Sequence, residues 1–375
     1  MKNERIIILF LISTLSQFPL SLIRFIIPIY AKSIGADTFI LGMMGSAYGL
    51  VYIILASYFG KISDKIGHKK MIIFGLIIYA LVVLIYPYIQ NPLFLIFIRG
   101  GEAVGMAMVW PSIEAFSQIV KEGKIEHSIM IYTLSWSIAA SIAPYIGAIY
   151  IDDFKIAILI VFIVSIFAAV VSIFIPRYEN LKINIKERKF DLFNEIVVPI
   201  FIYGFNSAII LSFYPAYGDF IGLGVMKTGI ILTVSGLFMV IAFICSGTIF
   251  SKYNKIWITF LGIVLQFPFL FVSYYGDFYI QLISLSLIFF GQGLIYFNVL
   301  VNIVSSFSNN VGSKTGLFES SLGLGFILGP LMGGLPTILK FHFPWILSLI
   351  FSIIIFFIYA NFLIKLYKNK NIIKS

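Results

Sequence analysis

Twelve apolar stretches, each about twenty residues long, follow one another along the chain and are separated by short polar segments. A helix of about 20 apolar residues crosses a hydrocarbon core about 30 Å thick, so each stretch predicts one transmembrane helix. Strands of a membrane barrel are about ten residues long and alternate in polarity, which these stretches do not. In chain order the expected spans are Arg5–Tyr30, Phe39–Phe59, Met71–Ile89, Leu93–Ile119, Ser128–Ile151, Ile156–Ile175, Ile196–Tyr217, Thr228–Phe250, Trp257–Tyr275, Ile280–Val304, Thr315–Leu339 and Phe343–Ile364.

The composition excludes a soluble globular protein. Apolar residues make up 60% of the chain, charged residues make up 11%, and the mean hydropathy is +1.04, whereas soluble chains carry about 25% charged residues. The single cysteine, Cys245, lies inside the eighth span, so no intrachain disulfide is possible. The three histidines lack the spacing of metal ligands. We therefore predict an all-α polytopic membrane protein and expect no metal and no cofactor.

Positive charges are distributed unequally between the two sides of the predicted membrane. Twenty lysines and arginines lie in the termini and in every second connection, four lie in the other connections, and Arg24 and Arg99 lie within spans. Short loops rich in Lys and Arg stay in the cytoplasm. The sequence thus predicts a multi-pass plasma-membrane protein with both termini cytoplasmic. The net charge of +10 reflects this topology rather than binding of nucleic acid.

The second half of the sequence repeats glycine and proline positions of the first half. A shift of 187 residues superposes Pro28 on Pro215 and Gly42 on Gly229, with further matches of the same kind. Gly and Pro determine close approaches and bends of helices, so the repeat predicts two pseudo-symmetric six-helix bundles. The predicted units are an N-terminal bundle at residues 1–176, a cytoplasmic linker at 177–195, and a C-terminal bundle with a short basic tail at 196–375.

A charged segment between the second and third spans carries a family signature. The segment from Gly60 to Lys70 reads GKISDKIGHKK and matches G-x-x-x-D-[K/R]-x-G-x-[K/R]-[K/R] at every fixed position. This pattern in this place resembles the major facilitator superfamily, whose members are secondary transporters with twelve helices in two bundles. The resemblance implies that the chain is such a transporter.

The resemblance also implies a gating role for this segment, which we expect to form a short hairpin loop. The candidate gating residues of the hairpin are Gly60, Asp64, Lys65, Gly67, Lys69 and Lys70. The resemblance implies that Asp64 faces the start of the eleventh helix, where the positive end of the helix dipole favours a carboxylate, and that this contact latches the outward-open state. A solvated basic turn would explain the lysines, but not Asp64 with two glycines at this spacing.

The eleventh span carries a second pattern of the family, G-x-x-x-G-P-x-x-G-G. The residues of this pattern, together with the proline at the equivalent place of the fifth span, are Gly325, Gly329, Pro330, Gly333, Gly334 and Pro144. Small residues let helices approach closely, and proline bends a helix. In the family the pattern is associated with antiporters when it lies on the fifth span, where this chain has only a degenerate version. We therefore interpret these residues as packing between the halves.

Charged side chains within the spans are candidates for function, since each costs about 3 kcal/mol at the bilayer centre unless it is paired or hydrated. Arg99, Glu102 and Trp110 share one face of the fourth span, and Gln17 and Arg24 share one face of the first. A rise of about 1.5 Å per residue places both arginines and Glu102 at a common depth. They form either part of a central cavity or a structural ion pair between the two spans.

Two further groups of polar residues are candidates. Glu114 and Glu319 lie at the cytoplasmic ends of the fourth and eleventh spans, where they either belong to an inner gate or neutralise basic loops. The second half offers hydrogen-bonding groups with apolar surface, which suit an organic molecule better than an inorganic ion. The uncharged cavity candidates of this half are Tyr203, Asn206, Tyr214, Asn298 and Asn302.

Three functional hypotheses remain. The favoured one is alternating-access transport with proton-coupled export of a small amphiphilic compound, in which Glu102 carries the proton and Arg24 and Arg99 tune it. The second is uptake or exchange of an organic anion that the arginines bind, and the third is a non-transport role as a membrane sensor or scaffold. No nucleotide-binding loop or catalytic constellation is present, so no enzymatic activity is expected. The expected partners of a functional monomer are a small-molecule substrate, protons and the lipid bilayer.

Overall fold

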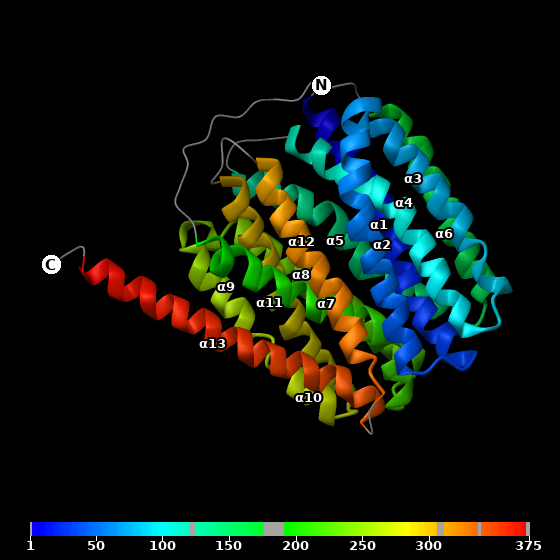
Figure 1. Cartoon of the computed structure of the whole chain (residues 1–375). Helices are drawn as coiled ribbons and strands as arrows, with labels where there is room; N and C mark the ends of the chain where they lie inside the picture. Colours follow the sequence, from blue (N-terminus) through cyan, green and yellow to red (C-terminus); the bar gives the residue numbers. More distant parts are fainter. Residues whose placement is uncertain (1, 120–124, 176–190, 306–310, 337–338, 373–375) are drawn as a thin grey trace.

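The computed structural model describes residues 2–119, 125–175, 191–305, 311–336 and 339–372, and the regular structure of these residues is helical without strands (Figure 1). The helices of the first half are α1 (Lys2–Ser33), α2 (Thr38–Ile66), α3 (His68–Val83), α4 (Pro92–Ile119), α5 (Ile125–Ile149) and α6 (Phe154–Val171). The helices of the second half are α7 (Val198–Phe220), α8 (Gly224–Gly247), α9 (Lys255–Val264), α10 (Phe269–Tyr274), α11 (Phe278–Ser305), α12 (Val311–Gly333) and α13 (Phe343–Ile372).

The number of membrane-crossing segments agrees with the sequence. Eleven segments of the described chain are long and apolar enough to cross a membrane by length and composition, and α9 with α10 forms one of them. α12 lies alongside these segments and makes the twelfth helix (Figure 1). The predicted all-α polytopic fold of twelve transmembrane helices is therefore confirmed.

The ninth span is broken, although we expected one continuous helix. α9 ends at Val264 and α10 begins at Phe269, directly after Pro268. Proline lacks a backbone N–H and disfavours helical geometry in the residue before it, so the helix stops there. The side-chain amide of Gln266 donates hydrogen bonds to the carbonyl oxygens of Gly262 and Ile288, at 3.0 and 3.2 Å, and links the break to α11.

The charged segment after the second span is mostly helical, which corrects the expected hairpin loop. α2 continues to Ile66, and only Gly67 separates it from α3. Gly67 has a φ of 98°, which glycine adopts without steric cost, and its N–H donates to the carbonyl of Ser63 at 2.8 Å. The side chain of Asp64 lies outside the described residues, as do those of the first turns of α12, so their contact stays a prediction.

We call the two ends of the helix bundle the Gly67 end and the Gly35 end. The Gly67 end contains the α2–α3 connection and the start of α1, as the position of the N-terminus in Figure 1 shows. The Gly35 end contains the α1–α2 connection, where Gly35 has a φ of 94°. According to the charge distribution, the Gly67 end is expected to face the cytoplasm. Residues 177–190 of the expected linker lie outside the described residues.

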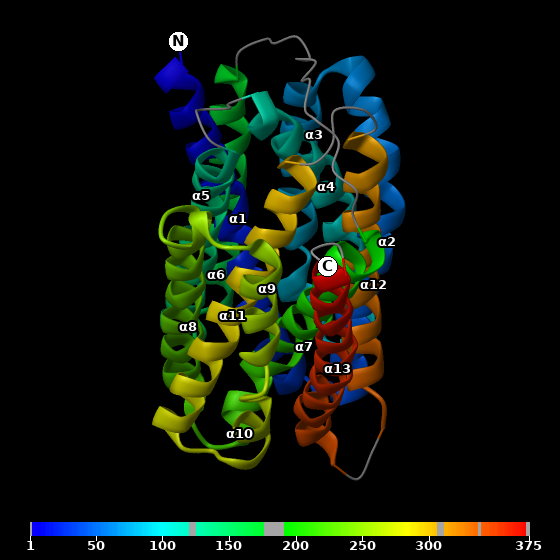
Figure 2. The same cartoon turned by 90° about the vertical axis from the view of Figure 1, so that its left-hand side faces the viewer.

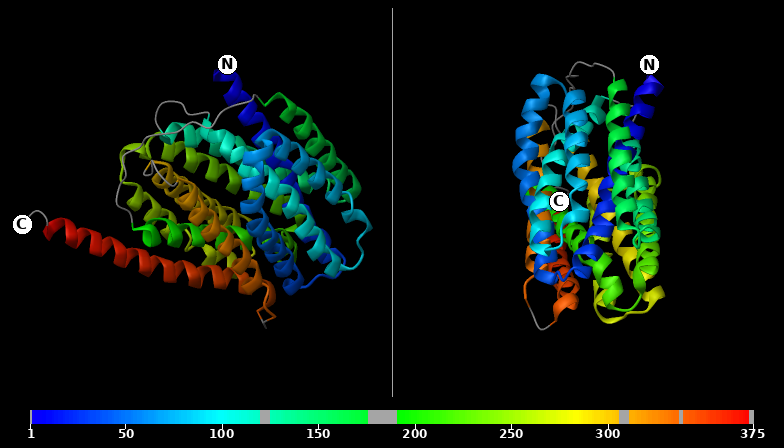
Figure 3. Two further views of the ribbon diagram at one scale, coloured as in Figure 1. Left: turned by 45° about the horizontal axis from the view of Figure 1, so that its top comes forward. Right: turned by 90° about the vertical axis from the view of Figure 1, so that its right-hand side faces the viewer.

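The two halves lie side by side in Figure 1, whereas Figure 2 shows the molecule from the second half and the right panel of Figure 3 shows it from the first. They meet along two main pairs of helices. α2 packs on α12, and α5 packs on α8. A Cβ atom on Gly42 would lie 2.4 Å from the carbonyl oxygen of Pro330, and one on Gly229 would lie 3.0 Å from that of Pro144. Gly42 and Gly229 are the glycines that the 187-residue shift superposes. The repeat in the sequence thus corresponds to a pair of equivalent contacts between the halves.

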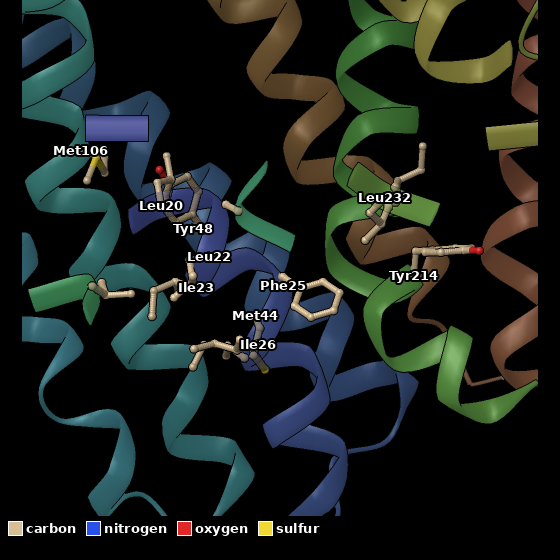
Figure 4. Packing of buried hydrophobic residues seen from close by; sticks show 14 of the residues in the cluster. Leu20, Leu22, Ile23, Phe25, Ile26, Met44, Tyr48, Met106, Tyr214 and Leu232 are labelled. Atoms are coloured by element: carbon tan, nitrogen blue, oxygen red, sulfur yellow. The ribbon is translucent and has the colours of Figure 1, made fainter. Parts of the chain in front are cut away.

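A core of buried apolar side chains extends through both halves. Ile23, Phe25 and Ile26 of α1 are at most 2% exposed, and Figure 4 shows them beside Met44 of α2. The same core continues to Tyr214 of α7 in the second half. Polar side chains within this apolar interior are therefore conspicuous, and they identify the site described next.

Candidate functional site

Two cavities lie between the halves, in the middle of the helix bundle. Their volumes are about 150 and 110 Å³. Residues of α1, α5, α7 and α12 line both of them, and these shared residues are Gln17, Arg24, Trp136, Tyr203 and Phe326. Because the two cavities share so many wall residues, we treat them as neighbouring chambers of one site.

The larger cavity, here called the acidic chamber, has two carboxyl groups and an aromatic wall. Glu114 of α4 and Glu319 of α12 line it from opposite halves. The hydroxyl of Tyr132 donates a hydrogen bond of 3.2 Å to Oε1 of Glu114. The aromatic wall consists of Tyr48, Tyr52, Trp110, Tyr132, Trp136, Tyr203, Tyr296 and Phe326. This chamber combines flat apolar surface with acceptors for a positively charged group.

The smaller cavity, here called the donor chamber, has polar side chains but no acidic one. Gln17 and Arg24 line it from α1, and Gln292 lines it from α11. Nε2 of Gln17 donates to Oγ of Ser21 at 2.8 Å. Nε2 of Gln292, a residue that is 2% exposed, has no hydrogen-bond partner among the described residues. The donor chamber therefore offers hydrogen-bond donors and one positive charge.

Tyr48 of α2 lies between the two arginines of the membrane interior. Cζ of Arg24 is 5.2 Å from the centre of its ring, and Cζ of Arg99 is 4.9 Å from it, which are cation–π distances. The same three side chains line a third, smaller cavity of about 30 Å³. The expectation that Arg24 and Arg99 lie at one depth agrees with this arrangement.

Glu102 lies apart from the two chambers. It is fully buried, accepts a hydrogen bond from the hydroxyl of Tyr86, and forms an ion pair with Arg99. Neither chamber is lined by Glu102 or by Arg99. The expected ion pair thus joins two residues of α4 rather than α1 and α4, and Arg24 stays outside it.

Comparison with known proteins decides the family. The family model "Major Facilitator Superfamily" matches residues 9–314, which is most of the chain. This protein belongs to the major facilitator superfamily. It is consequently a secondary transporter and not an enzyme.

The relatives of this MFS transporter are distant. It is 22% identical over 351 residues to an uncharacterised MFS-type transporter of Methanocaldococcus jannaschii, covering 88% of this chain and 90% of that one. It is 24% identical over 347 residues to multidrug resistance protein 2 of Bacillus subtilis, covering 86% of each. A solved structure of a variant of the nucleoside transporter NupG is similar with a TM-score of 0.74 at 15% identity, covering 95% of this chain and 99% of that one.

The polar residues expected in the second half of the MFS transporter lie at different places. Tyr203 lines both chambers. Asn206 is fully buried and donates to Oε1 of Gln266 and Oγ of Ser352, at 3.3 and 3.1 Å, inside the second half. The hydroxyl of Tyr214 donates to Oε1 of Gln281 at 3.1 Å.

Two asparagines of α11 are also buried within the second half. Nδ2 of Asn298 donates to the carbonyl of Leu294 at 2.8 Å, and Asn302 is 4% exposed. Neither asparagine lines the acidic or the donor chamber. Of the five residues expected in the second half, only Tyr203 therefore lines the chambers.

The candidate gating residues of the charged segment lie at the Gly67 end. Lys65 and Lys70 are exposed, Lys69 is half-buried, and a Cβ on Gly60 would meet nothing within 4 Å. These residues lie at the connection between α2 and α3 and do not line the chambers. Glu114 and Glu319, which we expected near an inner gate, are the two acidic residues that line the larger chamber.

The small residues of α12 pack on two sides. A Cβ on Gly325 would lie 2.5 Å from the backbone nitrogen of Phe205, and one on Gly329 would lie 2.5 Å from its carbonyl oxygen. These contacts are with α7 and lie within the second half. Pro330 and Gly334 instead approach Gly42 of α2, across the halves.

The remaining residues of these patterns have separate partners. Gly333 approaches the ring of Phe213 within the second half, and Pro144 both packs on Gly229 and lines the donor chamber. The predicted packing between halves therefore applies to only part of the pattern.

Sequence reasoning missed most of the aromatic wall. Tyr48, Tyr52, Trp136 and Tyr296 were not singled out, because aromatic residues are common throughout the chain. A signal was available in α5, where Trp136 lies one helical turn from Tyr132 on a helix that is otherwise rich in Ser and Ala. Large aromatic residues among small ones indicate a face that must fill or border a cavity.

Proposed function

We propose that this MFS transporter exports small amphiphilic organic compounds in exchange for protons. One observation carries the proposal: Glu114 and Glu319 come from opposite halves and line the same aromatic chamber. Aromatic faces bind flat organic molecules and attract cations. A carboxylate adds attraction for an amine, so the chamber suits organic cations with an aromatic body.

The pair of carboxyl groups supplies a simple mechanism of coupling. Two carboxylates that line one chamber repel each other, and a proton on one of them removes that repulsion. A bound organic cation removes it in the same way. Proton and substrate therefore compete for one site, and competition of this kind produces exchange when the site opens alternately to the two sides. Glu102, which Arg99 neutralises, is not needed as the proton carrier in this mechanism.

The alternation requires contacts that break at one end while others form at the opposite end. Nζ of Lys32 on α1 lies 2.7 Å from Oδ2 of Asp219 on α7 at the Gly35 end. Nζ of Lys255 on α9 lies 3.5 Å from Oε1 of Glu126 on α5 at the Gly67 end. Each pair joins the two halves. Opening of either end separates one pair and leaves the other in place.

The proposal includes an orientation and a location. The charge distribution supports a cytoplasmic Gly67 end with both termini in the cytoplasm, and export out of the cell is consistent with a location in the plasma membrane. The chambers lie within one chain, so a monomer contains the complete site. The name of the Bacillus subtilis relative, a multidrug resistance protein, supports efflux as the direction.

Flux measurements in proteoliposomes test the proposal. An aromatic amine dye should accumulate against its gradient when a pH gradient is imposed, and collapse of the gradient should stop accumulation. Glu114→Gln and Glu319→Gln should each abolish accumulation but retain dye exchange at equal pH. Glu4→Gln, the same change on an exposed residue of α1, is the matched control and should behave as wild type. Equal dye accumulation with and without a pH gradient would contradict proton coupling.

A second candidate function is uptake or exchange of an organic anion. The observation that favours it is Arg24, which lines both chambers and the third cavity. In this case an aromatic acid without an amine should be transported best, and the two glutamine variants should transport it at least as fast as wild type. The dye experiment, repeated with such an acid, separates the two candidates.

A further inference from the structure

The two chambers differ in their acidic residues and share their positive charge. Glu114 and Glu319 line only the acidic chamber, Gln292 lines only the donor chamber, and Gln17 and Arg24 lie on the wall that both chambers share. The chambers share the aromatic residues Trp136 and Tyr203 on their walls. A molecule that extended through both chambers would thus meet carboxyl groups at one end and donors at the other.

Arg24 has no acidic partner among the described residues. Arg99 is neutralised by Glu102, whereas the Arg24 guanidinium lies against Tyr48, 5.2 Å from the centre of its ring, and forms no ion pair with the described residues. An arginine within a membrane is costly unless an anion or water compensates it. Arg24 also lines all three cavities, so an anion that entered any of them would reach its guanidinium.

Gln292, a second donor of the donor chamber, also lacks an acceptor. Nε2 of Gln292 is buried and has no hydrogen-bond partner among the described residues. A buried donor without an acceptor is unfavourable, and a carboxylate or a similar oxyanion would supply acceptors to both Gln292 and Arg24. The donor chamber is therefore incomplete without an acceptor-rich group.

Helix geometry gives the distance along α12 from Glu319 to the level of the wall that the chambers share. Phe326 of α12 lines the donor chamber together with Arg24, and Glu319 lies seven residues before it on the same helix. A rise of about 1.5 Å per residue separates the two positions by about 10 Å. Arg24 and Phe326 line both chambers, so they mark the boundary between them.

We propose that the transported compounds are amphoteric, with an acidic group bound by Arg24 and Gln292 and an amine bound at Glu114 and Glu319. Their aromatic body lies along Trp136 and Tyr203, and about 10 Å separates the two charged groups. This substrate class rests on the proposed export function and narrows it. Arg24 acts here as a residue that determines specificity, and the proton competes only for the acidic end.

A matched series of compounds tests the proposal by binding alone. The series consists of an aromatic amino acid-like compound with amine and carboxylate about 10 Å apart, its methyl ester, and its N-acetyl derivative. Quenching of tryptophan fluorescence reports binding to the purified protein, since Trp110 and Trp136 lie on the chamber wall. The amphoteric compound should bind about tenfold or more tightly than either derivative, as expected for a charge-assisted hydrogen bond. An ester that bound as tightly would overturn the proposal.

Variants assign the effect to Arg24. Arg24→Gln should lower the affinity for the amphoteric compound to that for the ester, about tenfold, and leave the affinity for the ester unchanged. Arg24→Lys keeps the charge and should keep part of the preference, and it serves if Arg24→Gln does not fold. Arg5→Gln, the same change elsewhere on α1, should alter nothing. Equal loss of affinity for both compounds in Arg24→Gln would refute the assignment.

Three further outcomes separate this inference from its alternatives. If an inorganic anion compensates Arg24, the ester should lose affinity when gluconate replaces chloride, and that result would overturn the substrate assignment. If wild-type protein accumulates the ester and the amphoteric compound equally in a pH gradient, proton-coupled export stands and the inference fails. If no compound accumulates in a pH gradient but the binding preference is found, the export proposal fails and the assignment of Arg24 stands.

Discussion

Lys32 and Asp219 form an ion pair between equivalent positions of the two halves. Nζ of Lys32 lies 2.7 Å from Oδ2 of Asp219, and the two residues are 187 positions apart, which is the shift that relates the halves. Lys32 is in the last turn of α1 and Asp219 is near the end of α7. The pseudo-symmetry axis therefore passes near this pair, and the pair closes the Gly35 end.

Removal of this pair should favour opening at the Gly35 end. The side chains are 27% and 50% exposed, so the pair contributes about 1 kcal/mol at most and the population should shift about fivefold at most. Lys32→Gln should raise the rate at which a cysteine introduced at Ser212 reacts with a membrane-impermeant thiol reagent from outside. Lys255→Gln, which removes the pair at the Gly67 end, should lower it. Equal labelling rates in Lys32→Gln and Lys255→Gln would show that the two ion pairs do not favour opening at opposite ends.

The ion pair of Arg99 and Glu102 should stabilise the fold. Glu102→Gln leaves a buried arginine without its counter-charge, and we expect the free energy of unfolding in detergent to fall by about 3 kcal/mol. The double variant Arg99→Gln with Glu102→Gln should recover part of this loss because no charge is then left unpaired. Additive losses in the double variant would mean that the two residues are not coupled.

Close packing of α12 on α7 should make Gly329 sensitive to substitution. A Cβ at Gly329 would lie 2.5 Å from the carbonyl oxygen of Phe205, so Gly329→Ala forces the helices apart and should destabilise the protein by about 1–3 kcal/mol. Gly60→Ala is the control, since a Cβ there meets nothing within 4 Å. Melting temperatures of the two purified variants provide the comparison. A Gly329→Ala protein as stable as Gly60→Ala would argue against the close contact.

The topology can be tested by labelling single cysteines in intact cells. Cys245 is first replaced by serine, and cysteines are introduced at Asn184 of the expected linker and at Asp153 before α6. An impermeant reagent should label the Asp153 position from outside and the Asn184 position only after permeabilisation. Labelling of both positions from the same side would exclude the predicted orientation.

The fold was predictable because its signals are local. The length and polarity of each stretch determine a span, and the glycines and prolines that recur after 187 residues determine where the halves meet. Local signals also had limits, since the break at Pro268 and the helical course of α2 to Ile66 were not foreseen. The break at Pro268 lies within a continuous apolar stretch, which predicts one unbroken span. The end of α2 is strongly charged, and this charge suggested a loop.

The site was less predictable because the sequence of a helix does not tell which other helix packs on each of its faces. Glu102 and Trp110 share a face of α4, yet Trp110 lines a chamber and Glu102 is covered. α3 covers α4 there, because Gly75 and Gly105 bring their backbones close together. On α7, Tyr203 and Asn206 are likewise three residues apart, but Asn206 faces α13 through Ser352. The difference depends on contacts between segments that are distant in sequence.

Simultaneous measurement of proton and substrate movement tests the central claim most directly. Proteoliposomes with a pH-sensitive dye inside, at equal pH on both sides, receive a gradient of an amphoteric aromatic compound. Wild-type protein should move protons opposite to the compound, whereas Glu114→Gln and Glu319→Gln should move the compound without protons. Movement of the compound through wild-type protein with no accompanying proton flux would contradict the exchange at the carboxyl pair.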